Sequence, residues 1–129
     1  MGPFVSVAID ASVVIAWQNP AHVFHAAATQ MIAAAEPPLL MSELNLAEVL
    51  VGLDRADWAA FANALTAVGF QFCTPSAIEV AGARLDSHLR MPDAYVIATA
   101  RTAGATTILS LDAALIAAAQ SLGFGTSTL

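Results

Sequence analysis

Four acidic residues stand at places where the surrounding sequence offers a charged side chain no evident partner. They are Asp10, Glu48, Asp93 and Asp112. A carboxylate that loses its water without gaining a counter-charge is costly, and it is normally paired or protonated. The chain has 10 acidic residues against 4 arginines and no lysine, so its own cations cannot pair all of the acids. Divalent cations are the other obvious partner.

The chemistry that such acids support follows from the ions they prefer. Mg²⁺ binds oxygen ligands, retains several waters and needs only a few carboxylates. A Mg²⁺ or Mn²⁺ ion held in this way can activate a water molecule and stabilise negative charge on a phosphate during in-line displacement. The acids therefore predict a metal-dependent site for phosphoryl transfer or hydrolysis, with Mg²⁺ or Mn²⁺ as its cofactor.

Alternating strands and helices must position these acids. Short apolar runs without polar alternation predict buried strands over residues 5–9, 39–41, 70–73, 106–110 and 124–128. Apolar residues at helical spacing predict helices over residues 12–17, 22–35, 42–53, 54–68, 76–89, 94–103 and 113–122. This alternation indicates an α/β fold in which helices cover both faces of a mostly parallel sheet.

Two of the acids follow predicted strands. Asp10 comes directly after the run 5–9, and Asp112 comes two residues after the run 106–110. In a parallel sheet both positions lie at the carboxyl edge, where open α/β sheets bind ligands. A strand-end turn or a helix N-cap is the alternative interpretation of either residue.

The other two acids lie on predicted helices. Glu48 sits among apolar residues in the middle of a helix, whereas Glu43 of the same helix fits as a first-turn acid. Asp93 follows Pro92 and begins a helix, where the helix dipole alone would favour an acid. The spacing does not decide whether Asp93 reaches the carboxyl edge of the sheet.

Two serines near the acids have candidate supporting roles. Ser12 and Ser110 could orient Asp10 and Asp112 or hold a water on a bound metal. Helix capping alone would also explain either serine, and Ser12 is predicted to be the N-cap of the helix over 12–17.

The basic residues, histidines and cysteine suggest little further chemistry. Arg84 and Arg90 are the candidates for phosphate contacts, with a solvated surface position as the alternative. His22 and His25 lie three apart on one predicted helix face, but no third His or Cys has matching spacing, so we expect both at the surface. Cys73 is the only cysteine; no disulfide can form within the chain, and a reducing cytoplasm fits.

The bulk composition limits the possible functions. The formal net charge of −6 is unfavourable for binding nucleic acid through phosphate neutralisation alone. Hydrophobic residues make up 58% of the chain. No apolar run approaches the roughly 20 residues of a membrane span. The apolar excess predicts a crowded core and an apolar surface that a partner covers.

Four short motifs contain the four acids. They are Ile9-Asp10-Ala11-Ser12, Leu44-Asn45-Leu46-Ala47-Glu48-Val49, Met91-Pro92-Asp93-Ala94-Tyr95-Val96-Ile97-Ala98-Thr99-Ala100 and Ile108-Leu109-Ser110-Leu111-Asp112. In this order and at these spacings, the chain resembles the PIN-domain family along essentially its whole length. Within that family it is most similar to the VapC-type ribonuclease toxins of bacterial toxin–antitoxin systems.

The resemblance implies both a fold and a function. The fold would be a single PIN-like domain over residues 1–129, a three-layer α/β/α sandwich with about five short strands. Asp10, Glu48, Asp93 and Asp112 would form an acidic quartet that binds Mg²⁺ or Mn²⁺ and hydrolyses RNA phosphodiester bonds. The partners would be RNA, a VapB-type antitoxin of a type II system and a second copy of the chain. The location would be cytoplasmic, without membrane attachment.

Two other functions are compatible with parts of the pattern. A catalytically degenerate PIN domain would serve only as a protein-binding module, although all four acids are present here. An aspartyl phosphoacceptor domain also places an Asp at the end of its first strand. Such a domain usually needs a Lys near the phosphoryl group, and this chain has none. A hydrolase of that kind normally also has Asp where Ser12 stands.

Overall fold

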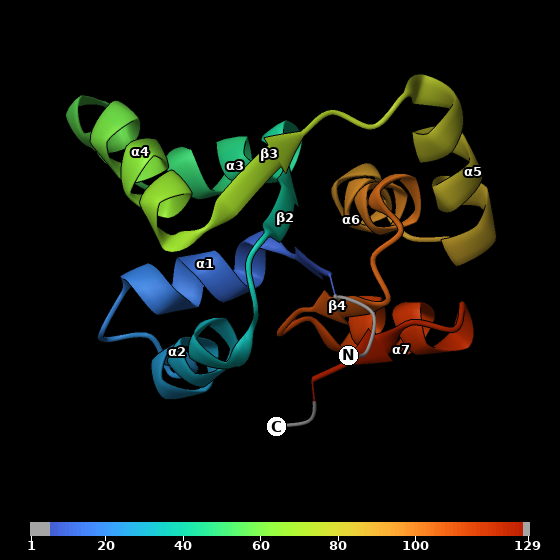
Figure 1. Ribbon diagram of the computed structural model, residues 1–129, viewed down its shortest axis with the longest axis horizontal. Helices are drawn as coiled ribbons and strands as arrows, with labels where there is room; N and C mark the ends of the chain where they lie inside the picture. The colour runs from blue at the N-terminus through green and yellow to red at the C-terminus, as the bar shows by residue number, and fades with distance from the viewer. Residues whose placement is uncertain (1–5, 128–129) are drawn as a thin grey trace.

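A five-stranded parallel sheet forms the centre of the molecule (Figure 1). The computed structural model describes residues 6–127. In chain order the strands are β1 Val7–Ile9, β2 Leu39–Ser42, β3 Phe70–Cys73, β4 Thr107–Leu109 and β5 Gly125–Thr126. Their order in space is β3-β2-β1-β4-β5, and every neighbouring pair is parallel. The predicted sheet of about five strands is confirmed.

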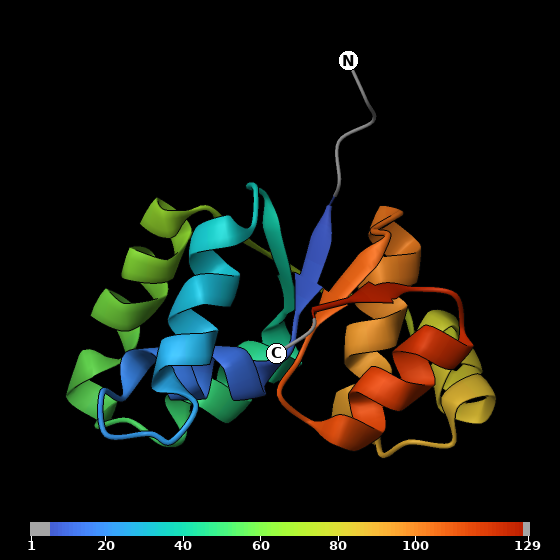
Figure 2. The same cartoon turned by 90° about the horizontal axis from the view of Figure 1, so that it is seen from below.

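Seven α-helices and one short 3₁₀ helix surround the sheet within residues 6–127. They are α1 Ala11–Gln18, α2 His25–Ala34, α3 Glu43–Leu50, η1 Arg55–Asp57, α4 Trp58–Val68, α5 Ala77–Ser87, α6 Met91–Ala103 and α7 Ala113–Ser121. Figure 2 shows α1 to α4 on one side of the sheet and α5 to α7 on the other. This confirms the predicted three-layer α/β/α sandwich.

The central strand contributes to two hydrophobic cores. Val7 and Ile9 pack with the layer of α1 to α4, whereas Ala8 packs with the layer of α5 to α7. Since helices cover both faces, every position of β1 is buried, and the strand reads as a continuous apolar run. The charged residue Asp10 follows directly after the carboxyl end of β1.

The strand order reverses between β1 and β4. After β1 the chain adds β2 and β3 on one side of the sheet, and β4 and β5 later pair on the other side. At such a switch point the two connections leave in opposite directions, which opens a crevice at the carboxyl ends of the strands. The backbone N–H of Asp10 donates to the Leu109 carbonyl at 2.9 Å and holds the two strand ends together there.

The starts of the first two helices differ from the prediction. Asp10 occupies the N-cap position of α1, so the prediction that Ser12 caps this helix is wrong, and Ser12 lies in its first turn. α2 begins at His25 rather than at 22. The residues before it form turns, in which the N–H of His22 donates to the Asn19 carbonyl at 2.9 Å.

Other predicted boundaries shift by a few residues. α3 ends at Leu50 instead of 53, and residues 55–57 form the 3₁₀ helix η1 instead of the first turn of an α-helix. Val5 and Thr128, the outer ends predicted for the first and last strands, lie outside the described residues. The order and type of the other elements agree with the prediction.

Gly69 ends α4, as the sequence predicts. Its φ of 118° lies in the left-handed region, which residues with a side chain rarely adopt. A Cβ at this position would also lie 3.0 Å from the Pro37 ring. The Gly69 carbonyl accepts a hydrogen bond from the N–H of Leu39 at 2.9 Å, so this glycine turns the chain from α4 into β3 alongside β2.

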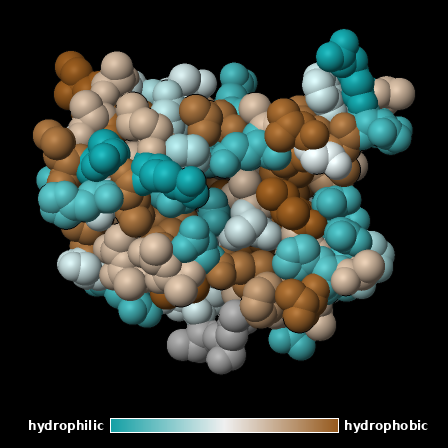
Figure 3. Space-filling model, turned by 180° about the vertical axis from the view of Figure 1, so that it is seen from behind, coloured by the Kyte–Doolittle hydropathy of each residue, from teal (hydrophilic) through white to brown (hydrophobic). Residues whose placement is uncertain are grey.

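The surface mixes apolar and polar residues. On the face drawn in Figure 3, hydrophobic and hydrophilic residues intermingle instead of forming one uniform patch. The large apolar side chains exposed among the described residues are Val23, Phe24, Val51, Val68, Ile78, Leu85 and Met91. No helix within residues 6–127 is both long and apolar enough to cross a bilayer.

Candidate active site

Asp10 lies at the crevice between β1 and β4 and is 6% exposed. Its Oδ2 accepts hydrogen bonds from the hydroxyls of Ser12 at 2.6 Å and Ser110 at 2.9 Å. These neutral donors satisfy part of the carboxylate without cancelling its charge. Oδ1 accepts no hydrogen bond from the described residues. Asp10 therefore has a fixed orientation and an oxygen left for a ligand.

The two hydroxyls also hold the loop that follows β4. The Ser12 hydroxyl accepts from the N–H of Leu111 at 3.0 Å, and the Ser110 hydroxyl accepts from the N–H of Asp112 at 2.9 Å. Each serine thus donates to Asp10 and accepts from the backbone. Both candidate supporting residues, Ser12 and Ser110, therefore contact Asp10, and Ser110 also holds the backbone N–H of Asp112.

Replacing Ser110 by Ala is expected to lower the free energy of unfolding by about 1–3 kcal/mol. Ser110 is completely buried, and its loss leaves the Asp10 carboxylate with one donor fewer and the Asp112 N–H without its acceptor. Urea unfolding in EDTA at neutral pH measures the change. Ser87→Ala is the control, because its hydroxyl accepts from the N–H of Leu89 in a half-buried turn. Equal losses in the two variants would contradict this role of Ser110.

Asn45 connects α3 to the start of α6. It is completely buried, and its Nδ2 donates to Glu48 Oε1 at 2.8 Å and to the Pro92 carbonyl at 3.1 Å. Its Oδ1 accepts from the Ser42 hydroxyl at 2.6 Å, and Ser42 caps α3 as predicted. Both ends of the amide are therefore satisfied. Asn45 holds Glu48 next to the segment that carries Asp93.

The role of Asn45 is not evident from the sequence. Of the residues of α3 only Asn45 and Val49 are buried, and the following Val51 is 75% exposed, so most apolar neighbours of Glu48 do not belong to the core. Glu48 is half-buried near the end of α3, and Glu43 is exposed in its first turn. The contact between Asn45 and Glu48 could have been predicted from their spacing, because residues three apart on a helix are neighbours.

Asp93 lies half-buried in the first turn of α6. Burial is the largest cause of a rise in its pKa from 3.8 to about 6. The negative charges of Asp10 and Asp112 raise this pKa further, and Glu48 adds to the rise, while Arg90 lowers it. A like charge raises a pKa only from nearby. The structure thus places Asp93 in one electrostatic region with the other three acids, which its spacing alone left undecided.

Asp112 caps α7. Its Oδ1 accepts from the N–H groups of Ala114 at 2.9 Å and Leu115 at 3.4 Å. The capping interpretation is therefore confirmed for one carboxylate oxygen. Oδ2 accepts no hydrogen bond from the described residues, and the side chain is only half-buried. Capping fixes the carboxylate at the crevice and leaves its second oxygen for a ligand.

The four acids share one end of the sheet without closing around a single point. Within residues 6–127, no three His, Cys, Asp or Glu side chains are grouped closely enough to hold one metal ion. The donors are nevertheless hard oxygens, and Mg²⁺ commonly binds one or two carboxylates and keeps several waters. The raised pKa of Asp93 indicates negative charge without sufficient compensation. This donor set fits a hydrated Mg²⁺ or Mn²⁺ ion.

The comparison with protein families decides the classification of the chain. The sequence pattern of the family described as PIN domain matches residues 7–121, which include all four acids. The chain belongs to the PIN-domain family. The resemblance seen in the motifs is thereby confirmed at the level of the family, and the fold is that of a PIN domain.

Solved structures share the fold of this PIN domain at low sequence identity. The crystal structure of Mycobacterium tuberculosis VapC20, a sarcin–ricin loop cleaving toxin, is 22% identical with a TM-score of 0.70, covering 92% of this chain and 96% of that one. A toxin–antitoxin complex from Klebsiella pneumoniae is 21% identical with a TM-score of 0.74, covering 95% and 97%. FitAB bound to an IR36 DNA fragment is 17% identical with a TM-score of 0.64, covering 94% and 93%. No curated protein matches in sequence.

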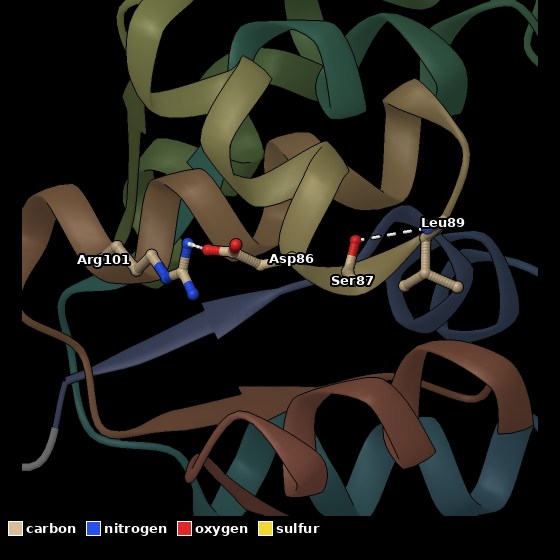
Figure 4. A network of polar contacts seen from close by, with 4 residues as sticks. All are labelled: Asp86, Ser87, Leu89 and Arg101. Atoms are coloured by element: carbon tan, nitrogen blue, oxygen red, sulfur yellow. Dashed lines mark hydrogen bonds and ion pairs between the residues drawn. The ribbon is translucent and has the colours of Figure 1, made fainter.

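The turn between α5 and α6 leads into the first turn of α6, which carries Asp93. Arg101 of α6 pairs with Asp86 of α5 at 2.8 Å, and the Ser87 hydroxyl accepts from the N–H of Leu89 (Figure 4). His88 ends α5 with a left-handed φ of 59°. The ion pair joins the last turn of α6 to the end of α5, and the Ser87 contact lies in the turn between the two helices.

The remaining arginines differ in their availability to a substrate. Arg55 lies 5.5 Å from the centre of the Trp58 ring, on the layer of α4. Arg84 is exposed on α5 and forms no ion pair within residues 6–127. Arg90 precedes α6 and acts on the pKa of Asp93. Of the two predicted phosphate contacts, Arg90 is therefore the one that the structure places near the acids.

Proposed function

We propose that this PIN domain is a metal-dependent endoribonuclease and the toxin of a type II toxin–antitoxin system. The observation that carries the proposal is the position of the four acids at one end of the sheet, where the charges of Asp10, Asp112 and Glu48 add to the effect of burial on the pKa of Asp93. Such a cluster favours a divalent cation with oxygen ligands. The shared fold with VapC20, a sarcin–ricin loop cleaving toxin, supports RNA as the substrate.

Each residue of the site has its own role in the proposed reaction. Asp10, Glu48, Asp93 and Asp112 bind Mg²⁺ or Mn²⁺. The bound cation would supply an activated water and stabilise charge on the scissile phosphate. Ser12 and Ser110 orient Asp10 through their hydroxyls, and Asn45 orients Glu48 through its amide. Asp93 must lose its proton before its carboxylate can bind the cation.

RNA binding has to overcome the formal net charge of −6. A divalent cation at the crevice offsets part of that charge locally, and Arg90, whose charge lowers the pKa of Asp93, is the proposed arginine contact to the same phosphate. In a homodimer, which we also propose, the second copy would add its own arginines. Contacts to phosphate remain few, so the affinity for RNA should depend only weakly on salt.

The proposed protein partner is a VapB-type antitoxin in the cytoplasm. A cationic antitoxin side chain at the acids would compete with the metal for the same negative charge. Apolar antitoxin residues would cover part of the exposed apolar surface. A protein of the same fold occurs in a toxin–antitoxin complex from Klebsiella pneumoniae, which supports a partner of this kind.

Removing divalent cations tests the proposed chemistry. We expect the purified protein to cleave single-stranded RNA in Mg²⁺ or Mn²⁺, and to lose about 100-fold or more of that rate in excess EDTA, because the acids cannot activate water without the cation. Adding back Mn²⁺ should restore cleavage, measured on labelled RNA by gel electrophoresis. Cleavage that persists in EDTA would show that the reaction does not need the metal.

A catalytically degenerate PIN domain is the second candidate function. It is favoured by the absence, within residues 6–127, of three potential ligands grouped around one point. Calorimetric titration with Mn²⁺ at neutral pH separates the two candidates. Heat of binding that disappears in Asp10→Asn supports the nuclease, whereas no binding by the unmodified protein supports a protein-binding module.

A further inference from the structure

A cavity of about 370 Å³ adjoins the acidic crevice. It is lined by Ser12, Ile15, His22, Phe24, Leu111 and Asp112. Ser12 and Asp112 also belong to the acid site, so a group in the cavity would lie directly beside a phosphate at the acids. The volume is within the range of small-ligand pockets, roughly 300–1,000 Å³. In Figure 2 the turns between α1 and α2 lie at the same end of the molecule as the carboxyl ends of the strands.

The part of the cavity wall outside the acid site is aromatic and apolar. Phe24 is 43% exposed, and its ring lies 6.0 Å from that of His22, centre to centre, at an angle of 39°. Ile15 and Leu111 complete this wall and are each partly buried. Within residues 6–127, neither Lys nor Arg lines the cavity. A flat, uncharged group is therefore better matched to this wall than a phosphate, which Asp112 would repel.

His22 adds a polar group with a defined role. Its Nδ1 accepts a hydrogen bond from the N–H of Phe24 at 3.0 Å. A neutral imidazole with Nδ1 as acceptor carries its hydrogen on Nε2, so the remaining polar atom of the ring is a donor. The carbonyl and ring-nitrogen acceptors on the edge of a nucleobase are partners for such a donor.

The turn that carries His22 and Phe24 is well anchored. The Asn19 side chain accepts from the N–H of Ala21 at 3.0 Å, and the His22 carbonyl accepts from the N–H of His25 at 3.0 Å. Nδ1 of His25 lies 3.0 Å from the Ala16 carbonyl and ties the start of α2 to α1. The aromatic wall is therefore held in place before a ligand arrives.

On the basis of the ribonuclease function proposed above, we propose that this cavity binds one unpaired nucleobase next to the scissile phosphate. The base stacks on Phe24, and His22 donates to its edge. Single-stranded RNA is recognised mainly by bases stacked on aromatic side chains and hydrogen-bonded at their edges. A chain with −6 charge and 4 arginines has few phosphate contacts to offer, so stacking is the available source of affinity.

Phe24→Ala tests the stacking contact by kinetics. We expect kcat/KM on single-stranded RNA to fall about tenfold, mainly through KM, because stacking of one base is lost. Phe24→Trp, which retains an aromatic ring, should restore most of the loss, whereas Phe24→Leu, which is equally apolar, should not. Val23→Ala is the matched control, since Val23 is 84% exposed, precedes Phe24 directly and does not line the cavity.

A binding measurement separates the subsite from the cleavage function. The probe is a short single-stranded oligouridylate with one fluorescent purine, added to Asp10→Asn protein that does not cut it. Stacking on Phe24 should quench the fluorescence of the purine. Introducing Phe24→Ala into the Asp10→Asn protein should abolish this quenching. If the oligonucleotide is quenched but the unmodified protein does not cleave RNA, the subsite is supported and the nuclease function is rejected.

If the unmodified protein cleaves RNA, and the Phe24 variants show the same kcat/KM and the same quenching as their parent proteins, the subsite alone is rejected. An effect of Phe24→Ala confined to binding of a co-expressed antitoxin would also overturn the proposal and assign the cavity to that partner.

Discussion

The Asp10→Asn variant is expected to lose about 100-fold or more of its kcat/KM on RNA while keeping the fold. Asn has nearly the same shape as Asp, and its amide oxygen can still accept from the hydroxyls of Ser12 and Ser110. The variant therefore preserves the polar contacts at the carboxyl end of β1. It removes the negative charge that a divalent cation needs and one of the oxygens able to coordinate it.

Cleavage of labelled RNA at several Mn²⁺ concentrations measures this effect. Asp54→Asn is the matched control, because it removes one negative charge from an exposed side chain that makes no hydrogen bond or ion pair with the described residues. The control should cleave like the unmodified protein. If Asp10→Asn cleaves equally well at every metal concentration, Asp10 is not a ligand and the proposed site is wrong.

The second large effect is on stability. Asp93→Asn should raise the melting temperature at neutral pH without metal. The pKa of Asp93 is about 6 in the folded protein against an ordinary value of 3.8. The folded protein thus binds this proton more tightly than the unfolded chain does. Stability is therefore lost as the pH rises from 3.8 through 6, and the ionised Asp93 destabilises the fold at neutral pH.

The size and pH dependence of this gain can be predicted together. Asp93 is half-buried, so solvent screening reduces the destabilisation that its ionised carboxylate causes. We expect Asp93→Asn to raise the melting temperature by a few degrees, which corresponds to about 1 kcal/mol in a domain of this size. The difference between variant and unmodified protein should shrink as the pH falls through about 6 and vanish below 3.8, where Asp93 is protonated in both the folded and the unfolded state. Equal melting temperatures at neutral pH would contradict the like-charge cluster.

Metal binding should reverse the order of the two proteins. Mg²⁺ or Mn²⁺ at neutral pH should stabilise the unmodified protein more than Asp93→Asn, since a ligand that binds only the folded state raises its stability. The metal competes with the proton on Asp93, so its affinity should weaken as the pH falls below about 6. Differential scanning fluorimetry across pH, with and without metal, measures both trends.

The sequence was sufficient for the fold because its central strands are buried on both faces. A run such as 5–9, with no polar alternation, can belong only to a covered sheet or a buried helix, and its shortness and β-branched residues favour the strand. The error at Ser12 arose because Asp10 and Ser12 are both good capping residues two positions apart. Only the structure decides that Asp10 takes the N-cap position and Ser12 donates to it.

The candidate site was predictable where it depends on strand ends and unpredictable where it depends on packing between distant helices. Asp10 and Asp112 follow adjacent parallel strands, so their shared edge followed from the fold class. Asp93 reaches the same region because α6 packs on β1, β2 and α3, and no local spacing encodes this packing. Asn45 contacts Pro92 across 47 residues of sequence, and this partner could not be read from the motif around it.

The distance along the chain between the two halves of the crevice affects when the proposed active site can form during synthesis. The hydrogen bond from Ser110 to Asp10 spans 100 residues, and β1 is paired on that side only by β4. A ribosome that has translated the first three strands has therefore made Asp10 and Glu48, but neither the strand that supports Asp10 nor Asp112. Long-range parallel pairing of this kind also folds slowly. Under the proposed function, a nascent chain would thus be unable to cleave RNA until β4 and Asp112 have been translated.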